Sequence, residues 1–188
     1  MRTTTVRRRF TLMDAVVLIA ATAVSLVPVR LYLEGPWPPP LTLDDWSLGS
    51  LWTSAAALSR LLSPFAVGLC LALPLLRLTE SQPEWRRVMA QPGMVACIAT
   101  VMATVLLLLK IVITHSYYHQ SKWGPPLPSI GPFLLRSPWN GEVVAVAWTI
   151  LWLSGSWRPV SNWIDRTGRM LGIYWMTDSL FFALPMVV

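Results

Sequence analysis

The fold is decided by the stretch Met94-Val-Ala-Cys-Ile-Ala-Thr-Val-Met-Ala-Thr-Val-Leu-Leu-Leu-Leu-Lys110-Ile-Val-Ile-Thr114. This stretch is apolar on every face that a helix would present, and Lys110 carries its one charge. At ~1.5 Å of rise per residue, a helix of this length covers the ~30 Å hydrocarbon core of a bilayer. The stretch therefore predicts a transmembrane helix.

The composition of the whole chain is typical of a membrane protein. Of its 188 residues, 54% are hydrophobic and only 13% are charged, which is too little polar surface to cover a soluble globule of this size. The formal net charge is +6, but the basic residues gather at the ends of the apolar runs and do not form a patch interleaved with aromatic residues. We therefore expect the lipid bilayer as a partner and no nucleic acid.

Three further apolar runs have the same character as the first, and polar or proline-rich loops separate the four. The predicted spans cover residues 12–33, 51–78, 94–115 and 142–158. If the spans alternate, most basic residues fall on one side of the membrane, which is then the cytoplasmic side. These residues are Arg2, Arg7, Arg8, Arg9, Arg77, Arg86, Arg87, Arg158, Arg166 and Arg169. The bias predicts that both termini are cytoplasmic.

The segment of residues 161–176 has a different pattern. Trp163, Met170 and Tyr174 are spaced near one helical face, and the charged residues are offset from it. This pattern predicts a basic amphipathic helix along the anionic inner leaflet. The expected fold class is all-α: an integral membrane helical bundle of four transmembrane helices plus a C-terminal amphipathic helix, with residues 1–188 forming a single membrane domain.

The first span begins with residues that favour a helix start. Thr11 is the expected N-cap, and Asp14 lies in the first turn, where a carboxylate suits the helix dipole. An alternative stays open, because Arg7-Arg-Arg-Phe-Thr11 also resembles a twin-arginine export signal, in which case the first run would be cleaved. The apolar run continues through Val29, which is longer than a typical signal core.

The two cysteines, Cys70 and Cys97, both lie inside apolar spans. We expect them to be buried as small hydrophobic residues and not to form a disulfide framework.

Arg60 is the residue that most needs an explanation, because it falls inside the second predicted span. An intramembrane arginine costs a few kcal/mol on insertion scales and normally faces a partner or water. Two interpretations stay open. Arg60 is buried and paired, or the helix begins near Arg60 and the residue lies at the membrane interface.

Other polar residues in the chain lie near predicted span ends. Lys110 is expected to extend its side chain toward the interface. His115 and His119 would share one helical face, a spacing suited to two metal ligands, and Glu142 at the start of the next span is a candidate third ligand. An interfacial cluster of histidine and tyrosine is the favoured alternative, and no cofactor is expected.

Two segments of the chain carry a resemblance. The first reads Arg7-Arg-Arg-Phe-Thr-Leu-Met-Asp-Ala-Val-Val-Leu-Ile-Ala-Ala-Thr-Ala-Val24, and the second reads Asn162-Trp-Ile-Asp-Arg-Thr-Gly-Arg-Met-Leu-Gly172. Both resemble parts of uncharacterised small multi-span membrane proteins of planctomycete bacteria. The resemblance implies a multi-pass protein of the bacterial inner membrane and implies no activity.

The functional hypothesis that the sequence favours is a non-enzymatic accessory or scaffold subunit, which packs against other membrane proteins or against copies of itself. The competing hypothesis is a small permease or a channel-forming oligomer, with Arg60 and Lys110 near an anion path. A membrane enzyme that uses His115, His119 and Glu142 with a metal is the third.

Overall fold

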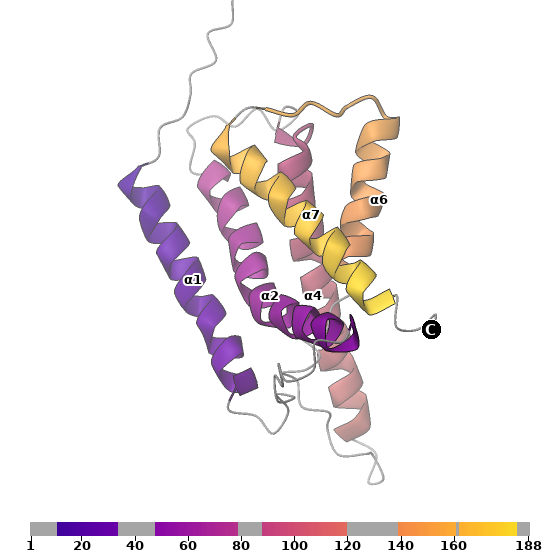
Figure 1. The fold of residues 1–188 in the computed structure, drawn as a ribbon. Helices are drawn as coiled ribbons and strands as arrows, with labels where there is room; N and C mark the ends of the chain where they lie inside the picture. Colours follow the sequence, from indigo (N-terminus) through magenta and orange to yellow (C-terminus); the bar gives the residue numbers. More distant parts are fainter. Residues whose placement is uncertain (1–10, 34–47, 79–87, 120–138, 161, 184–188) are drawn as a thin grey trace, which may run out of the picture.

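A computed structural model describes residues 11–33, 48–78, 88–119, 139–160 and 162–183. The regular elements among these residues are all helices, so the all-α prediction is confirmed. They pack as one bundle (Figure 1). The helices are α1 (Leu12–Leu33), α2 (Leu48–Leu78), α4 (Pro92–His119), α6 (Trp139–Leu153) and α7 (Trp163–Ala183).

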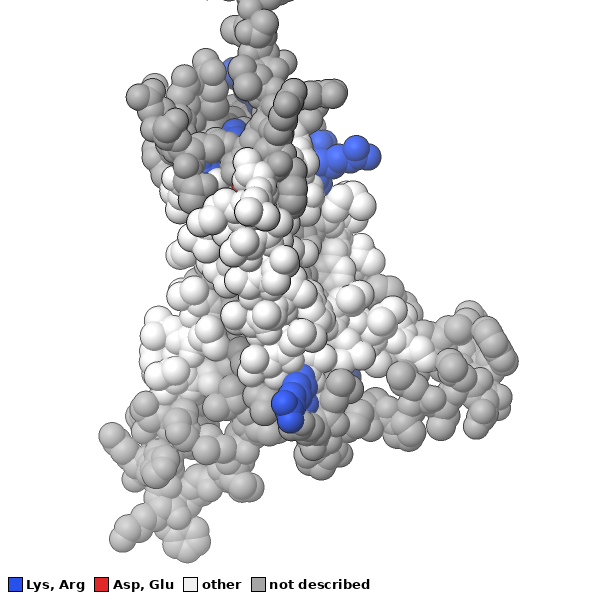
Figure 2. Space-filling view, turned by 90° about the vertical axis from the view of Figure 1, so that its left-hand side faces the viewer, with Lys and Arg blue, Asp and Glu red and all other residues white. Residues whose placement is uncertain are grey.

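Three of the helices are long and apolar enough to cross a membrane, over Leu12–Arg30, Ser54–Leu78 and Pro92–Ile113. On the face that Figure 2 shows, the visible lysine and arginine atoms lie toward the two ends of the molecule, and the described surface between them is uncharged. The structure thus shows a helical bundle with three candidate spans. The finer arrangement of four spans plus an amphipathic helix is not confirmed.

The fourth predicted span is shorter in the structure than in the sequence analysis. α6 ends at Leu153, whereas the span was predicted to reach residue 158. Gly155 has a φ of 64°, a left-handed conformation that favours glycine. Its N–H donates to the carbonyl of Trp152 at 3.0 Å, and the Ser156 N–H donates to the carbonyl of Leu151 at 3.2 Å. These two bonds form a Schellman cap, which stops the helix.

The helices run alternately up and down between two ends of the bundle. In Figure 1, α1, α4 and α7 begin at one end of the bundle, and α2 and α6 end there. We call this the upper end and the opposite one the lower end. α2 is bent, and its first turns run at an angle to the rest (Figure 1). Pro64 lies inside α2, and a proline within a helix removes a backbone hydrogen bond and favours such a bend.

α7 is part of the bundle, where it contacts α2, α4 and α6. It begins within the stretch predicted as a surface helix and continues past residue 176 to Ala183. Ile164, Leu171 and Trp175 are buried in the core, and Trp175 is 1% exposed. The predicted helix exists, but its buried residues are the ones that directly follow the predicted face of Trp163, Met170 and Tyr174, and Met170 itself is 64% exposed.

The core of the bundle lies where α2, α4, α6 and α7 meet. Cys70, Leu73, Cys97 and Val144 are fully buried there beside Trp175. Both cysteines are free and buried, as the sequence predicted.

α1 packs mainly against α2 and contributes little to this core. Its start has the predicted capping geometry. The Asp14 N–H donates to Oγ1 of Thr11 at 3.3 Å, and the Thr11 N–H donates to Oδ2 of Asp14 at 2.9 Å. The reciprocal pair satisfies two N–H groups at the helix start, so the N-cap prediction is confirmed.

Candidate functional site

Arg60 lies well inside α2, which begins at Leu48, and its side chain is half-buried. It directly follows Ser59, whose hydroxyl donates to the carboxylate of Asp178 on α7. Arg60 is therefore next to a contact between α2 and α7 that the sequence did not predict.

Lys110 lies on the exposed surface of α4. Its Nζ is 5.8 Å from the centre of the Trp139 ring at the start of α6, within the range of a cation–π contact. The two cations proposed for an anion path thus contact different elements, since Arg60 lies by α7 and Lys110 lies by α6.

The three candidate metal ligands lie on α4 and α6. His115 and His119 belong to the last turns of α4, but their side chains lie outside the described residues. Glu142 is exposed in the first turn of α6. Among the described side chains, no group of three histidine, cysteine, aspartate or glutamate residues could hold a metal ion.

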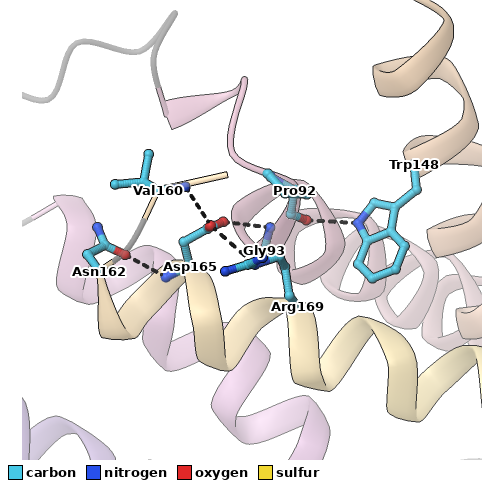
Figure 3. Close-up of polar contacts among 7 residues, drawn as sticks. All are labelled: Pro92, Gly93, Trp148, Val160, Asn162, Asp165 and Arg169. Atoms are coloured by element: carbon cyan, nitrogen blue, oxygen red, sulfur yellow. Dashed lines mark hydrogen bonds and ion pairs between the residues drawn. The ribbon is translucent and has the colours of Figure 1, made fainter. Parts of the chain in front are cut away.

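Asp165, in the first turn of α7, is the centre of a polar cluster at the upper end of the bundle (Figure 3). Its Oδ1 accepts a hydrogen bond from the Gly93 N–H at 2.8 Å, and its Oδ2 accepts one from the Val160 N–H at 3.0 Å. The Nε of Arg169 lies 3.4 Å from Oδ2. The backbone N–H of Asp165 donates to Oδ1 of Asn162 at 2.7 Å, which caps α7. The Asp165 carboxylate therefore binds the first turn of α4 and the backbone of Val160 just before α7.

Close backbone contact surrounds this carboxylate. A Cβ at Gly168 would lie 2.5 Å from the Gly93 carbonyl oxygen, so α4 and α7 approach here to a distance that only glycine allows. The Trp148 indole of α6 donates to the carbonyl of Pro92 at 2.8 Å (Figure 3). Three helices thus meet around a carboxylate whose two oxygens are both occupied. We call the residues Pro92, Gly93, Trp148, Val160, Asn162, Asp165, Gly168 and Arg169 the Asp165 cluster.

A second polar cluster joins α2 and α7 deeper in the bundle. The Ser59 hydroxyl donates to Oδ1 of Asp178 in a very short contact. The Tyr174 hydroxyl donates to the Ser59 carbonyl at 2.8 Å and lies 3.3 Å from Oγ of Ser59. Asp178 is only 2% exposed. We call Ser59, Arg60, Tyr174 and Asp178 the Asp178 cluster.

A shallow groove of about 260 Å³ runs beside the Asp178 cluster. Ser59, Tyr174, Thr177 and Asp178 line one part of it, and Ala55, Leu58 and Leu62 line the rest. The Asp178 cluster thus borders a groove, whereas both oxygens of the Asp165 carboxylate accept hydrogen bonds from backbone N–H groups. The Asp178 cluster is therefore the candidate functional site.

Arg60 was predicted from the sequence as a candidate site residue, but Tyr174 and Asp178, which both contact the adjacent Ser59, were not. One signal was available, because Asp178 is an isolated acid four residues after Tyr174, and residues at this spacing share a helical face.

Comparison of the chain with family models, with curated proteins and with solved structures gave no match.

Proposed function

We propose that the chain is a non-enzymatic accessory or scaffold subunit of an assembly in the bacterial inner membrane. The observation that carries this proposal is the contrast between the two halves of α4. Most residues of its first half, 92–103, are buried, whereas none of residues 104–113 is. Val105, Leu109 and Ile113 are 51%, 52% and 59% exposed, which leaves an apolar helix surface that a partner helix can cover.

Site-specific photo-crosslinking in native membranes tests the proposal. A photoreactive residue at Leu109 is expected to give discrete protein adducts, because a partner helix would lie against this half of α4. Val24 of α1, which is 72% exposed, is the control position and is expected to give lipid adducts only. Lipid adducts alone at both positions would contradict the scaffold function.

The topology that we propose places the upper end of the bundle in the cytoplasm. Arg77, Arg158, Arg166 and Arg169 belong to segments at that end, which supports this orientation. Reporter fusions after residues 40, 90 and 130 should report outside, inside and outside. α7 begins at the upper end and runs away from it (Figure 1). The four-span arrangement requires a cytoplasmic C-terminus, and a fusion after residue 188 tests this requirement.

Flux measurements separate the scaffold from a permease. Purified protein in liposomes that contain a halide-sensitive dye is expected to show no flux above empty vesicles. Flux that disappears in the Arg60→Ala variant and persists in Lys110→Gln would instead favour a permease, with Arg60 on its path.

A further inference from the structure

One face of α7 is exposed from near its start to near its end. Arg166, Met170, Ile173, Thr177 and Leu180 are all exposed, and their spacing of three or four residues places them in one row along the helix. Met170, Ile173 and Leu180 are 64%, 53% and 60% exposed. We call these five residues the Arg166 stripe. It begins with a cation and continues with mainly apolar side chains.

Close contacts with α4 fix the position of α7 beside a candidate membrane span. The span covers Pro92–Ile113 of α4. A Cβ at Gly168 would lie 2.5 Å from the Gly93 carbonyl oxygen, and a Cβ at Gly172 would lie 3.0 Å from Cβ of Ala96. The first turns of α7 therefore lie beside the first turns of this span.

These contacts place Arg166 at the edge of the apolar layer. Arg166 precedes Gly168, which is level with the start of the α4 span, whereas Met170 and Ile173 follow it. At ~1.5 Å of rise per residue, α7 rises about 10 Å from Arg166 to Ile173, which is within the ~15 Å that one leaflet contributes to the hydrocarbon core. The guanidinium thus lies at the depth of the headgroups, and the two apolar side chains lie at the depth of the acyl chains.

The one hydroxyl group in the Arg166 stripe is compatible with contact to hydrocarbon. Thr177 donates its hydroxyl hydrogen to the carbonyl of Ile173 in the same helix, at 3.0 Å. A hydroxyl that is satisfied within its own helix presents no unused hydrogen to lipid. The stripe below Arg166 is therefore suited to an acyl chain.

The described acids at the upper end do not balance the charge of Arg166. The neighbouring Asp165 is fully buried, and its oxygens are occupied by two backbone N–H groups and by Arg169. Asp14 is 1% exposed and caps α1. Arg166 is exposed and makes no ion pair with any described residue. Its planar guanidinium can therefore bind a phosphate group with two parallel N–H donors.

We propose that the Arg166 stripe binds one anionic phospholipid. The headgroup phosphate binds the guanidinium of Arg166, and an acyl chain packs along Met170 and Ile173. One lipid molecule thus matches both parts of the stripe, the cation and the apolar row below it. A headgroup with a net negative charge is preferred to a zwitterionic one, because the described acids at this end are buried and cannot bind a headgroup ammonium. The proposal does not depend on the scaffold function.

Photoaffinity labelling of the full-length protein in phosphatidylcholine nanodiscs tests the proposal. The probe lipid carries a diazirine in the middle of one acyl chain, and it is phosphatidylglycerol in one sample and phosphatidylcholine in the other. The readout is the ratio of labelling by the two probes at residues 170–173. We expect a ratio of at least about three there. At Val24 of α1, which is 72% exposed, the ratio should be close to one.

Three variants locate the contact. Arg166→Gln removes the cation and is expected to lower the ratio at residues 170–173 to about one. Arg166→Lys keeps the charge without the planar guanidinium, and should keep at least about half of the enrichment. Arg158→Gln is the matched control, because Arg158 is also an exposed arginine but lies between α6 and α7, outside the Arg166 stripe. Its ratio should equal that of the wild type.

Several results would overturn the proposal. A ratio near one in the wild type, or a ratio unchanged by Arg166→Gln, would show that Arg166 does not select an anionic lipid. An equal fall in Arg158→Gln would indicate diffuse attraction to a basic end and no site. Absence of labelling by both probes would show that protein covers the stripe.

A competition experiment separates the lipid from free phosphate. Inorganic phosphate is expected to lower the ratio no more than sodium chloride of the same ionic strength, because it lacks the acyl chain and acts only by screening. Stronger suppression by phosphate would identify a site for the free anion in place of a lipid.

Discussion

Asp165 and Asp178 lie on the same helix and are both buried, yet different kinds of donor hold them. Asp165 accepts hydrogen bonds from the backbone N–H groups of Gly93 and Val160. Asp178 accepts its hydrogen bond from the Ser59 side chain and forms part of the wall of a groove. The two carboxylates thus have the same burial and different capacity to accept a further partner.

The difference shows how the hydrogen-bond donors around a buried acid separate a structural acid from a candidate binding acid. Backbone amides at a helix start are fixed in place and carry partial positive charge, so they saturate a carboxylate permanently. Side-chain donors at the edge of a helix pair leave lone pairs unused. Burial alone does not distinguish the two cases, but the identity of the donors does.

The largest effect is expected from the loss of the Asp165 carboxylate. Asp165→Ala leaves the buried Gly93 N–H and the partly buried Val160 N–H without their acceptor, and removal of one member of a buried charged contact costs about 3–5 kcal/mol. Asp178→Ala should cost less, because it removes one side-chain acceptor beside a groove. The free energy of unfolding of the purified protein in detergent measures both. Equal losses would remove the distinction between the two aspartates.

The next effect concerns the close approach of α4 and α7 at the Asp165 cluster. In Gly168→Ala the added methyl group meets the Gly93 backbone, which cannot move aside as a side chain can, and overpacking of this kind costs about 1–3 kcal/mol. Gly68→Ala is the matched control between α1 and α2, because the nearest atom there is the movable Ser25 hydroxyl. The midpoint of thermal unfolding should fall further in Gly168→Ala. A larger fall in Gly68→Ala would place the tightest contact between α1 and α2.

A smaller effect is expected for the indole that joins α6 to the Asp165 cluster. Trp148→Phe removes the donor to the Pro92 carbonyl, a net loss of about 1 kcal/mol for the hydrogen bond, with some further loss of packing. Trp152→Phe on the same helix is the control, since Trp152 is 68% exposed. Denaturant titration compares the two variants, and identical midpoints would mean that the hydrogen bond contributes nothing.

The smallest effect is expected at the Asp178 cluster. Tyr174→Phe removes the hydroxyl that donates to the Ser59 carbonyl but keeps the edge-to-face contact with Trp175, whose ring centre is 5.1 Å away. The expected loss is about 0.5–1 kcal/mol. A loss as large as that of Asp165→Ala would show that the Asp178 cluster is as structural as the Asp165 cluster. Unfolding in detergent is again the measurement.

Local chemistry was predictable from the sequence, and contacts between distant residues were not. The Thr11 and Asp14 cap depends on neighbouring residues, and the bounds of α1 follow from one apolar run, so both predictions agree with the structure. The early end of α6 was missed, although Gly155 after a helix is a recognised stop signal.

The place of α7 could not be derived from its periodicity. An amphipathic pattern shows that a helix has an apolar face, but it does not say whether lipid or other helices cover that face. Asp165 was assigned to the polar side, whereas its acceptors bind the Gly93 amide of α4, far away in the sequence. Helix pairing decides such contacts, and a single sequence carries little information about it.

The central position of α7 has a bearing on how the protein is made. α7 is the last of the described helices along the chain, yet Trp175 fills the core between Cys70, Cys97 and Val144. While the ribosome is still synthesising residues before Trp163, this cavity is open and the Gly93 amide has not met its carboxylate. Co-translational insertion therefore yields an incomplete bundle, and a membrane protease or chaperone that recognises unpaired helices has an interval in which to bind it.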